Sequence, residues 1–192
     1  MDVFCLFFIY TKSLSDMKGS IPDSLQELIK KHHGGPGMWK KILEHAGLPH
    51  DFKIYAHKDV DDETVKTLID SAAKVLGITY DEAADAFGDY WMNEYAPMKY
   101  FAFFNRPRTA KEFLLEMNRV HEKITAKVEN AKPPHFEYKT PDRNTLIMKY
   151  ESERGMYPIF VGLVRAVGKY YKEDIKVLRS GDNSVKVSFN YV

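Results

Sequence analysis

The spacing of hydrophobic residues changes partway along this chain, and the change separates two kinds of predicted element. In the first half, apolar residues recur at three- and four-residue steps, which is the spacing of one face of a helix. Gly- and Pro-containing breaks divide this half into segments. The pattern predicts helices over Ser24–His33, Met38–His45, 61–76 and Glu82–Tyr95, an irregular aromatic stretch over Pro97–Pro107, and a further helix over 111–128.

After Pro133 and Pro134 the apolar residues alternate with polar ones, which indicates strands. The alternation predicts strands over His135–Lys139, Thr145–Arg154, Ile175–Arg179 and Val185–Val192, with a helix over Met156–Tyr171 between the second and the third. Helices followed by a small antiparallel sheet indicate an α+β fold. We therefore expect an N-terminal helical lobe followed by a mixed lobe.

The strand over Thr145–Arg154 ends in an unusual row of side chains. If the strand alternates to its end, one face carries Leu146 and Met148, and then Tyr150, Ser152 and Arg154. A phenol, a hydroxyl and a guanidinium in a row can hold an anionic head group, since guanidinium binds carboxylate or phosphate through two parallel hydrogen bonds. The alternative is an ordinary amphipathic strand with a surface arginine.

One histidine occupies an apolar position on the predicted helix over 111–128. Leu114, Met117, His121, Ile124 and Val128 fall on one face of that helix. A histidine there is either a packed core residue or an axial ligand of iron, which needs a neutral imidazole in an apolar shell. Together with the candidate anion clamp, His121 supplies the parts of a haem pocket.

The arrangement of these residues resembles that of a known family. The motif Tyr-x-Ser-x-Arg falls on Tyr150, Ser152 and Arg154, and Pro133-Pro134 stands between it and His121. The opening Met17-Lys18-Gly19 and the run from Ser152 to Tyr157 also match. The chain resembles the haem–nitric oxide/oxygen binding (H-NOX) domains, which are related to the haem domain of soluble guanylate cyclase.

The resemblance implies how the chain is organised. Residues 1–16 would be an extension, and residues 17–192 a single domain with a helical lobe over about 17–80 and a mixed lobe over about 81–192. Haem b would be buried between the lobes, with His121 on the iron and Tyr150, Ser152 and Arg154 on the propionates. Other residues expected at the cofactor are Ile21, Leu25, Trp91, Tyr95, Met117, Pro134, Met156, Ile159 and Leu163.

Two of these positions also have plainer interpretations. Pro134 resembles the family proline that presses on the porphyrin from the side of the iron-bound histidine, and Ile21 resembles its counterpart on the opposite, distal side. Such contacts would distort the ring and store strain. Rigidity of a loop explains a proline equally well, and core packing explains an isoleucine.

The residue at the gas-binding side decides the expected ligand. Relatives that hold oxygen carry a tyrosine where this chain has Ile159, so the resemblance implies binding of nitric oxide and carbon monoxide with oxygen discriminated against. Trp91 could donate a hydrogen bond from its indole, although packing explains it as well. Tyr157, two residues before Ile159 on a helix, should point away. An oxygen sensor or storage protein of the same fold is the alternative.

The implied mechanism is signalling without catalysis. Nitric oxide would weaken the iron–His121 bond, and the lobes would shift relative to one another. Partners in the family include histidine kinases, cyclic-di-nucleotide enzymes and chemotaxis receptors. A haem enzyme is disfavoured because no distal His–Arg pair is evident, and a haem-free interaction module with a packed His121 remains open.

The composition excludes several other classes of protein. Among 192 residues, 28 Lys and Arg balance 27 Asp and Glu, which leaves no basic surplus for nucleic acid. The single cysteine, Cys5, excludes an internal disulfide and a cysteine-based metal site. The apolar run over 1–10 is too short to span a membrane and lacks signal-peptide features. We therefore expect a cytoplasmic protein without a membrane span.

Overall fold

The first part of the chain is a group of three helices. The computed structural model describes residues 16–126, 131–181 and 183–191. Short strands β1 (Asp16–Met17) and β2 (Val60–Asp61) pair antiparallel and bring the start of the domain beside the start of the third helix. The first helix begins four residues earlier than the apolar spacing predicts, and the second begins three residues earlier. The helices are α1 (Ser20–His32), α2 (Gly35–His45) and α3 (Asp62–Leu76).

Local hydrogen bonds define where the next helices start. Asp61 caps α3 by accepting a hydrogen bond from the Thr64 backbone N–H at 2.9 Å. Thr79 and Glu82 form a reciprocal capping box at the start of α4 (Tyr80–Tyr90). Gly77 ends α3 with a φ of 68°, a left-handed conformation that favours glycine.

The predicted helix over Glu82–Tyr95 does not run to its end as an α-helix. At Trp91 it widens into one turn of π-helix, η1 (Trp91–Tyr95), in which the Ala96 N–H donates to the Trp91 carbonyl five residues back. Pro97 explains the widening, because it lacks an N–H and its ring would clash with the carbonyl four residues earlier. The predicted irregular stretch is also wrong in part, since it contains α5 (Ala96–Lys99) and α6 (Phe101–Phe104).

The helix that carries His121 is interrupted. The structure divides it into α7 (Ala110–Leu115) and α8 (Met117–Thr125), with Glu116 between them at φ −88° and ψ −2°. The sequence pattern does not predict the break because apolar spacing continues across it. Val128 of the predicted stripe lies outside the described residues.

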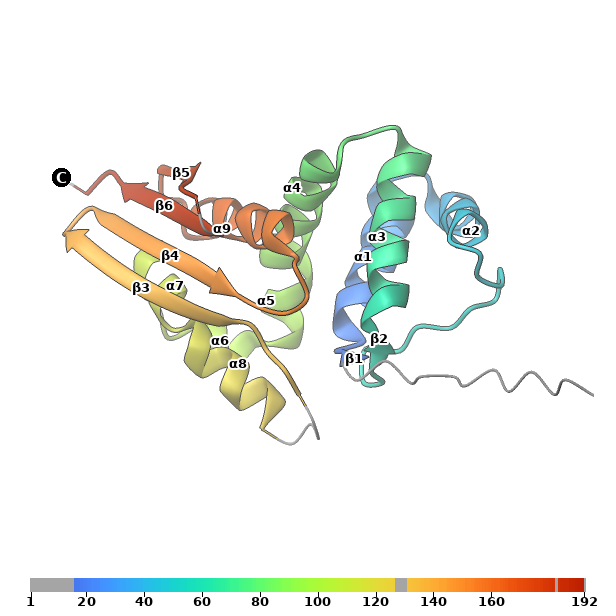
Figure 1. Cartoon of the computed structure of the whole chain (residues 1–192), viewed down its shortest axis with the longest axis horizontal. Helices are drawn as coiled ribbons and strands as arrows, with labels where there is room; N and C mark the ends of the chain where they lie inside the picture. The colour runs from blue at the N-terminus through green and yellow to red at the C-terminus, as the bar shows by residue number, and fades with distance from the viewer. Residues whose placement is uncertain (1–15, 127–130, 182, 192) are drawn as a thin grey trace, which may run out of the picture.

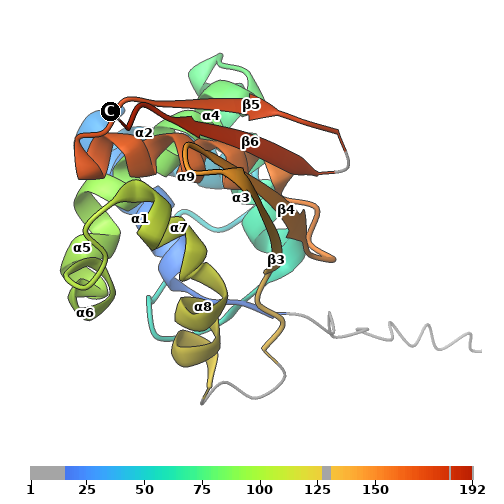
Figure 2. The same cartoon turned by 90° about the vertical axis from the view of Figure 1, so that its left-hand side faces the viewer.

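The remaining strands form one antiparallel sheet, which confirms the α+β fold. Its strand order is β3-β4-β6-β5, and α9 (Tyr157–Tyr171) connects β4 to β5. Helices α7 and α9 contribute side chains to the same buried cluster as β4 and β6, so they cover one face of the sheet (Figures 1 and 2). The strands are β3 (His135–Asp142), β4 (Thr145–Glu151), β5 (Ile175–Arg179) and β6 (Ser184–Phe189).

Strand β4 is shorter than predicted, and this changes the site. It ends at Glu151, so Ser152 and Arg154 lie in the turn that follows, before Gly155 with a φ of 66°. The expectation that period-two alternation places Ser152 and Arg154 on the face of Tyr150 is therefore wrong. Leu146, Met148 and Tyr150 do share a buried face.

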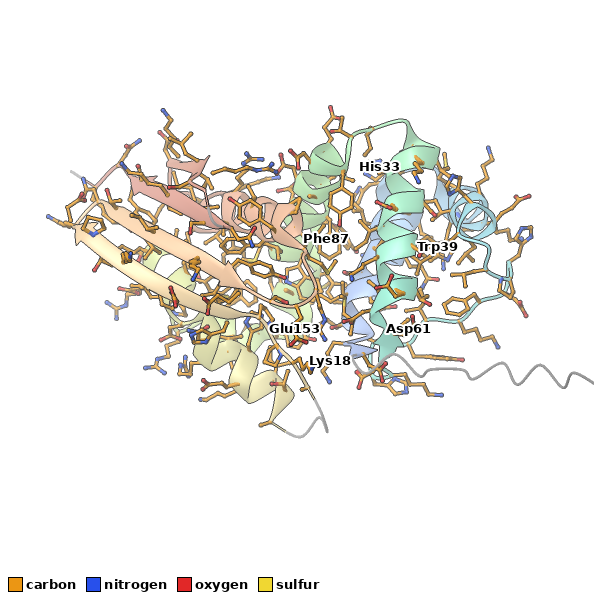
Figure 3. The ribbon with its side chains drawn as sticks, in the orientation of Figure 1. Lys18, His33, Trp39, Asp61, Phe87 and Glu153 are labelled. Carbon is orange, nitrogen blue, oxygen red and sulfur yellow. The ribbon has the colours of Figure 1, made fainter. Side chains whose placement is uncertain are left out.

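The helical group and the sheet group meet along α4 and α9. A Cβ on Gly88 would lie 2.4 Å from the Gly162 carbonyl carbon, so only residues without side chains allow the two backbones to approach this closely. Side chains of α4, among them Phe87, point the other way into the core of α1–α3 (Figure 3). Trp91 and Leu163 contact both hydrophobic clusters and mark their boundary.

Candidate functional site

A cavity of about 220 Å³ opens where the two hydrophobic clusters meet. Its walls come from the start of α1, from α4 and η1, from α8, from the loop before β3, and from β4 and α9. Most of the lining is aromatic or aliphatic. Nine of the residues predicted from the sequence line it: Ile21, Trp91, His121, Pro134, Tyr150, Arg154, Met156, Ile159 and Leu163.

Four predicted residues lie outside this cavity. Leu25 is buried in the core of the helical group, and Tyr95 is buried behind Trp91 with its ring stacked on the indole. Met117 lines an adjoining apolar cavity of about 110 Å³. Ser152 lies in an open groove outside the mouth, which Arg154 also lines.

His121 lines both cavities, and so does Ile124. Leu114 and Met117 line the smaller cavity as well, which confirms that the stripe from Leu114 to Ile124 forms one face. The His121 ring lies against Phe136, with 5.7 Å between ring centroids.

The surroundings of His121 keep its imidazole neutral. Burial lowers its pKa from 6.5 to about 4, because the charged form would lose its hydration. Its Nδ1 atom is buried and has no hydrogen-bond partner among the described residues. Buried ring nitrogens normally have a partner, and a neutral imidazole with one nitrogen uncommitted is a competent metal ligand.

Arg154 stands at the mouth of the cavity and is held by three segments of chain. Its Nε donates to both carboxylate oxygens of Asp62 on α3, at 3.0 Å each. Its terminal nitrogens donate to the backbone carbonyls of Lys132 and of Asp16. The predicted clamp for an external anion is therefore already engaged with an acid of the chain itself.

The other two motif residues have different surroundings. Tyr150 is 7% exposed, and its ring stacks on Phe160 with 5.3 Å between centroids. Ser152 accepts a hydrogen bond from the Arg154 backbone N–H at 3.3 Å, so it shapes the turn that presents the guanidinium.

The wall formed by α1, α4 and α9 is mainly apolar. Ile159 and Leu163 of α9, Phe87 of α4 and Ile21 of α1 all contribute apolar side chains to the lining. Tyr157 points away, as predicted, and its hydroxyl donates to the Ser184 carbonyl at 2.6 Å.

Sequence reasoning missed several residues of the site. Phe87, Tyr100, Phe136 and Phe160 line the cavity, but the sequence marks them only as apolar positions. Asp62 lies in the first turn of α3, where an acid is already explained by the helix dipole. It also accepts the hydrogen bond from Arg154, which lies 92 residues away, and no local sequence pattern predicts such a partner.

The assembled groups fit an iron porphyrin. A neutral buried imidazole is an iron ligand, the flat aromatic lining suits the macrocycle, and a guanidinium at the mouth suits its carboxylates. In the described residues, no cluster of three or more His, Cys, Asp or Glu side chains offers a site for a bare metal ion. Nor does any helix of the described part have the length and hydrophobicity to span a membrane.

Comparisons with known proteins agree with this geometry. The haem-NO-binding family model matches residues 18–179. Soluble guanylate cyclase gcy-35 of Caenorhabditis elegans is 30% identical over 159 residues, which are 80% of this chain and 23% of that protein. Soluble guanylate cyclase gcy-37 of the same organism is 29% identical over 78% of this chain and 22% of its own length. The chain thus spans about a quarter of the curated relatives it matches.

Solved structures share the fold. A Cs H-NOX mutant superposes with a TM-score of 0.79 at 24% identity, covering 91% of this chain and 97% of that one. An oxygen-binding H-NOX domain related to soluble guanylate cyclases superposes with a TM-score of 0.76 at 24% identity, covering 91% and 96%. Because the family model covers most of the sequence, this chain belongs to the haem-NO-binding family, whose members are the H-NOX domains.

Proposed function

We propose that this protein is a haem-based gas sensor in which His121 is the axial ligand of haem b. The observation that supports it best is the state of His121: a neutral imidazole with an uncommitted buried nitrogen, facing an apolar cavity between two hydrophobic clusters. When bound, the haem supplies a ferrous iron that takes a diatomic gas. The chain supplies the ligand, the dry surroundings and the anchoring of the cofactor.

Anchoring falls to the motif residues. Arg154 would bind a haem carboxylate in place of one of its backbone carbonyl contacts, since a charge-assisted hydrogen bond is stronger than a neutral one. Tyr150 lies on the cavity wall within reach of the same region, and Ser152 holds the turn that carries Arg154. Pro134 and Ile21, which also line the cavity, would contact the macrocycle.

The proposed gases are nitric oxide and carbon monoxide, with oxygen discriminated against. Ile159 presents no hydrogen-bond donor to the cavity, and its neighbours Leu163 and Phe87 present none either. A partly charged bound oxygen gains from a donor, whereas nitric oxide needs none for tight binding. Losing such a bond lowers affinity by about one to two decades.

An oxygen-binding sensor or storage protein is the second candidate, and one observation favours it. The side chains of Tyr100 and Ser20 line the cavity, with the Tyr100 hydroxyl donating to Ser20 Oγ at 3.1 Å. A rotated Ser20 or Tyr100 hydroxyl could supply the donor that Ile159 lacks.

The signal would leave through the elements that hold the site. His121 belongs to α8, and Arg154 joins α3 and β1 to the turn after β4. A change at the cavity therefore acts on the helices α1–α3 relative to the sheet group, which are the two proposed lobes, about 17–80 and 81–192. The receiver would be a histidine kinase, a cyclic-di-nucleotide enzyme or a chemotaxis receptor in the cytoplasm, with no catalysis by this domain itself.

The ferrous absorption spectrum tests the proposal. Protein expressed with ample haem is reduced and recorded without gas, in air, with carbon monoxide and with nitric oxide. We expect a haem band that shifts with carbon monoxide and with nitric oxide and stays unchanged in air. A stable complex in air would instead establish the oxygen-binding candidate, and protein without a haem band would contradict both.

A paired variant tests the ligand. His121→Gly should lose haem unless imidazole is added, because free imidazole can occupy the vacated volume and coordinate the iron. His33→Gly is the matched control, since His33 is partly exposed just after the end of α1 and lines neither cavity (Figure 3). Equal haem retention and equal spectra in the two variants would show that His121 is not the ligand.

A further inference from the structure

Three tyrosines on successive turns reach across to helix α1. Tyr90 donates to Glu27 Oε2 at 3.0 Å, Tyr95 to Asp23 Oδ2 at 2.7 Å and Tyr100 to Ser20 Oγ at 3.1 Å. The tyrosines are five residues apart, while their partners step backwards along α1 by four and three residues. We call these three contacts the tyrosine ladder.

A regular α-helix could not present this ladder. Residues five apart on an α-helix point in directions about 140° apart, because one turn takes about 3.6 residues. The π-helical turn η1 closes its hydrogen bond five residues back, from the Ala96 N–H to the Trp91 carbonyl, and thereby brings Tyr95 below Tyr90. The widened turn caused by Pro97 therefore aims both hydroxyls at α1.

The ladder ends at the cavity. Ser20 and Ile21, in the first turn of α1, both line it, and so does Tyr100. The Tyr95 ring stacks on Trp91, another lining residue, with 5.2 Å between ring centroids. One part of the cavity wall thus comes from the start of α1, from η1 and from Tyr100 between α5 and α6, and the hydroxyl contacts of Tyr95 and Tyr100 join these elements.

The middle contact is made by the most deeply buried of the three tyrosines. Tyr95 has 0% of its surface exposed, and its hydroxyl donates to a charged acceptor. Burial and the neighbouring Asp23 carboxylate raise the pKa of Tyr95 far above its usual value, so it remains a donor at every physiological pH. The Tyr90 contact lies nearer the surface, where Lys31 also donates to the Tyr90 hydroxyl.

We propose that Tyr95 and Tyr100 are positioning residues that hold the first turn of α1 against η1 and against the junction of α5 and α6, and so control how readily a gas reaches the proposed haem site. The control of gas entry rests on the proposed function, whereas the positioning of α1 does not. Movement of α1 away from η1 requires both hydrogen bonds to break, and it displaces Ile21 from the cavity wall. The ladder then sets the population of open conformers through which a ligand enters.

The test removes one oxygen atom. Tyr95→Phe keeps the ring and its stacking on Trp91 but leaves Asp23 without its donor. Hydrogen exchange of the backbone amides of residues 21 and 23–25, measured without haem, should accelerate about tenfold, the factor expected for losing one hydrogen bond to a charged group. In the haem-bound ferrous protein, the association rate of carbon monoxide should rise about threefold or more.

Two further variants separate the ladder from general destabilisation. Tyr171→Phe removes another buried hydroxyl, one that has no hydrogen-bond partner in the described residues, and should change neither measurement. Asp23→Asn keeps an acceptor oxygen for Tyr95 but removes its charge, so it should accelerate both processes less than Tyr95→Phe does, because a neutral acceptor forms a weaker hydrogen bond than a carboxylate.

Each outcome is decisive. Faster exchange together with faster association supports the inference. Unchanged exchange in Tyr95→Phe overturns the ladder, and faster exchange with an unchanged association rate overturns its link to the site. If the unaltered protein takes up no haem, the proposed function is overturned and with it the link to gas entry. The exchange measurement still decides whether the ladder holds α1.

Discussion

The Arg154 guanidinium and the Asp62 carboxylate join the two halves of the molecule, with Nε 3.0 Å from both carboxylate oxygens. Both side chains are largely buried, at 12% and 6% exposure. The contact ties the first turn of α3 to the turn after β4, at the mouth of the cavity. It accounts for an acid at the start of a helix that helix capping alone does not require, because Asp61 already caps α3.

Asp62→Asn should lower the free energy of unfolding by about 3 kcal/mol, because it leaves the Arg154 charge buried with only neutral acceptors. Urea unfolding of the haem-free protein measures the change. The control is Asp85→Asn, which breaks a half-exposed ion pair with Arg165 and should cost at most about 1 kcal/mol. Equal effects of the two substitutions would mean that the buried pair contributes no more than a surface pair.

Stability of the haem-free protein should fall as the pH is lowered from about 6.5 to 4. The pKa of His121 is about 4 when folded, below its unfolded value of 6.5, so the unfolded chain binds a proton in this window and the folded chain does not. The contribution is fully present above pH 6.5, and on the order of 3 kcal/mol is lost by pH 4. Urea unfolding at several pH values checks it. Between pH 6.5 and pH 4, the free energy of unfolding of His121→Phe should fall by about 3 kcal/mol less than that of the unaltered protein.

Gly162→Ala should destabilise the protein by about 1–3 kcal/mol. The added Cβ would lie 2.2 Å from the Ala84 carbonyl oxygen, which is backbone and cannot rotate away, so α4 and α9 must separate. Gly37→Ala in α2 is the control, since its Cβ would meet nothing within 4 Å and alanine favours a helix. Thermal unfolding should therefore show opposite shifts for the two variants.

Ile159→Tyr should raise oxygen affinity by about one to two decades, because it adds a hydroxyl donor to the wall of the cavity. The ferrous spectrum in air measures it. Ile159→Phe adds the same ring without the hydroxyl and should leave oxygen binding unchanged. If both variants bind oxygen equally, ring size rather than hydrogen bonding controls the choice of gas.

Local patterns predicted much of the fold. Period-three and period-four spacing identified the helices, alternation identified the strands, and the helix stripe placed His121 on the buried face with Leu114 and Met117. These predictions succeed because each depends on residues a few positions apart. The breaks at Trp91 and Glu116 were missed, since apolar spacing continues through a π-turn and through a one-residue interruption between two helices.

The site residues were also predicted only in part. The motif and the histidine identified Tyr150, Arg154 and His121 as candidates, and the structure brings all three to one cavity. Tyr95 and Leu25 were placed at the cofactor by resemblance, but both lie behind the wall, because neighbouring turns of a helix can face a cavity or its supporting core. Ser152 turned outward because β4 ends before it.

The sequence by itself determined the class of fold, the family, and the imidazole and guanidinium on which the proposed chemistry depends. Only the tertiary structure decided that Asp62 holds Arg154, and that Asp23 and Ser20 receive the tyrosine hydroxyls. The physical reason is sequence distance. Apolar burial is encoded by short periodic spacing, whereas a hydrogen bond between residues 72 or 92 positions apart depends on how whole elements pack.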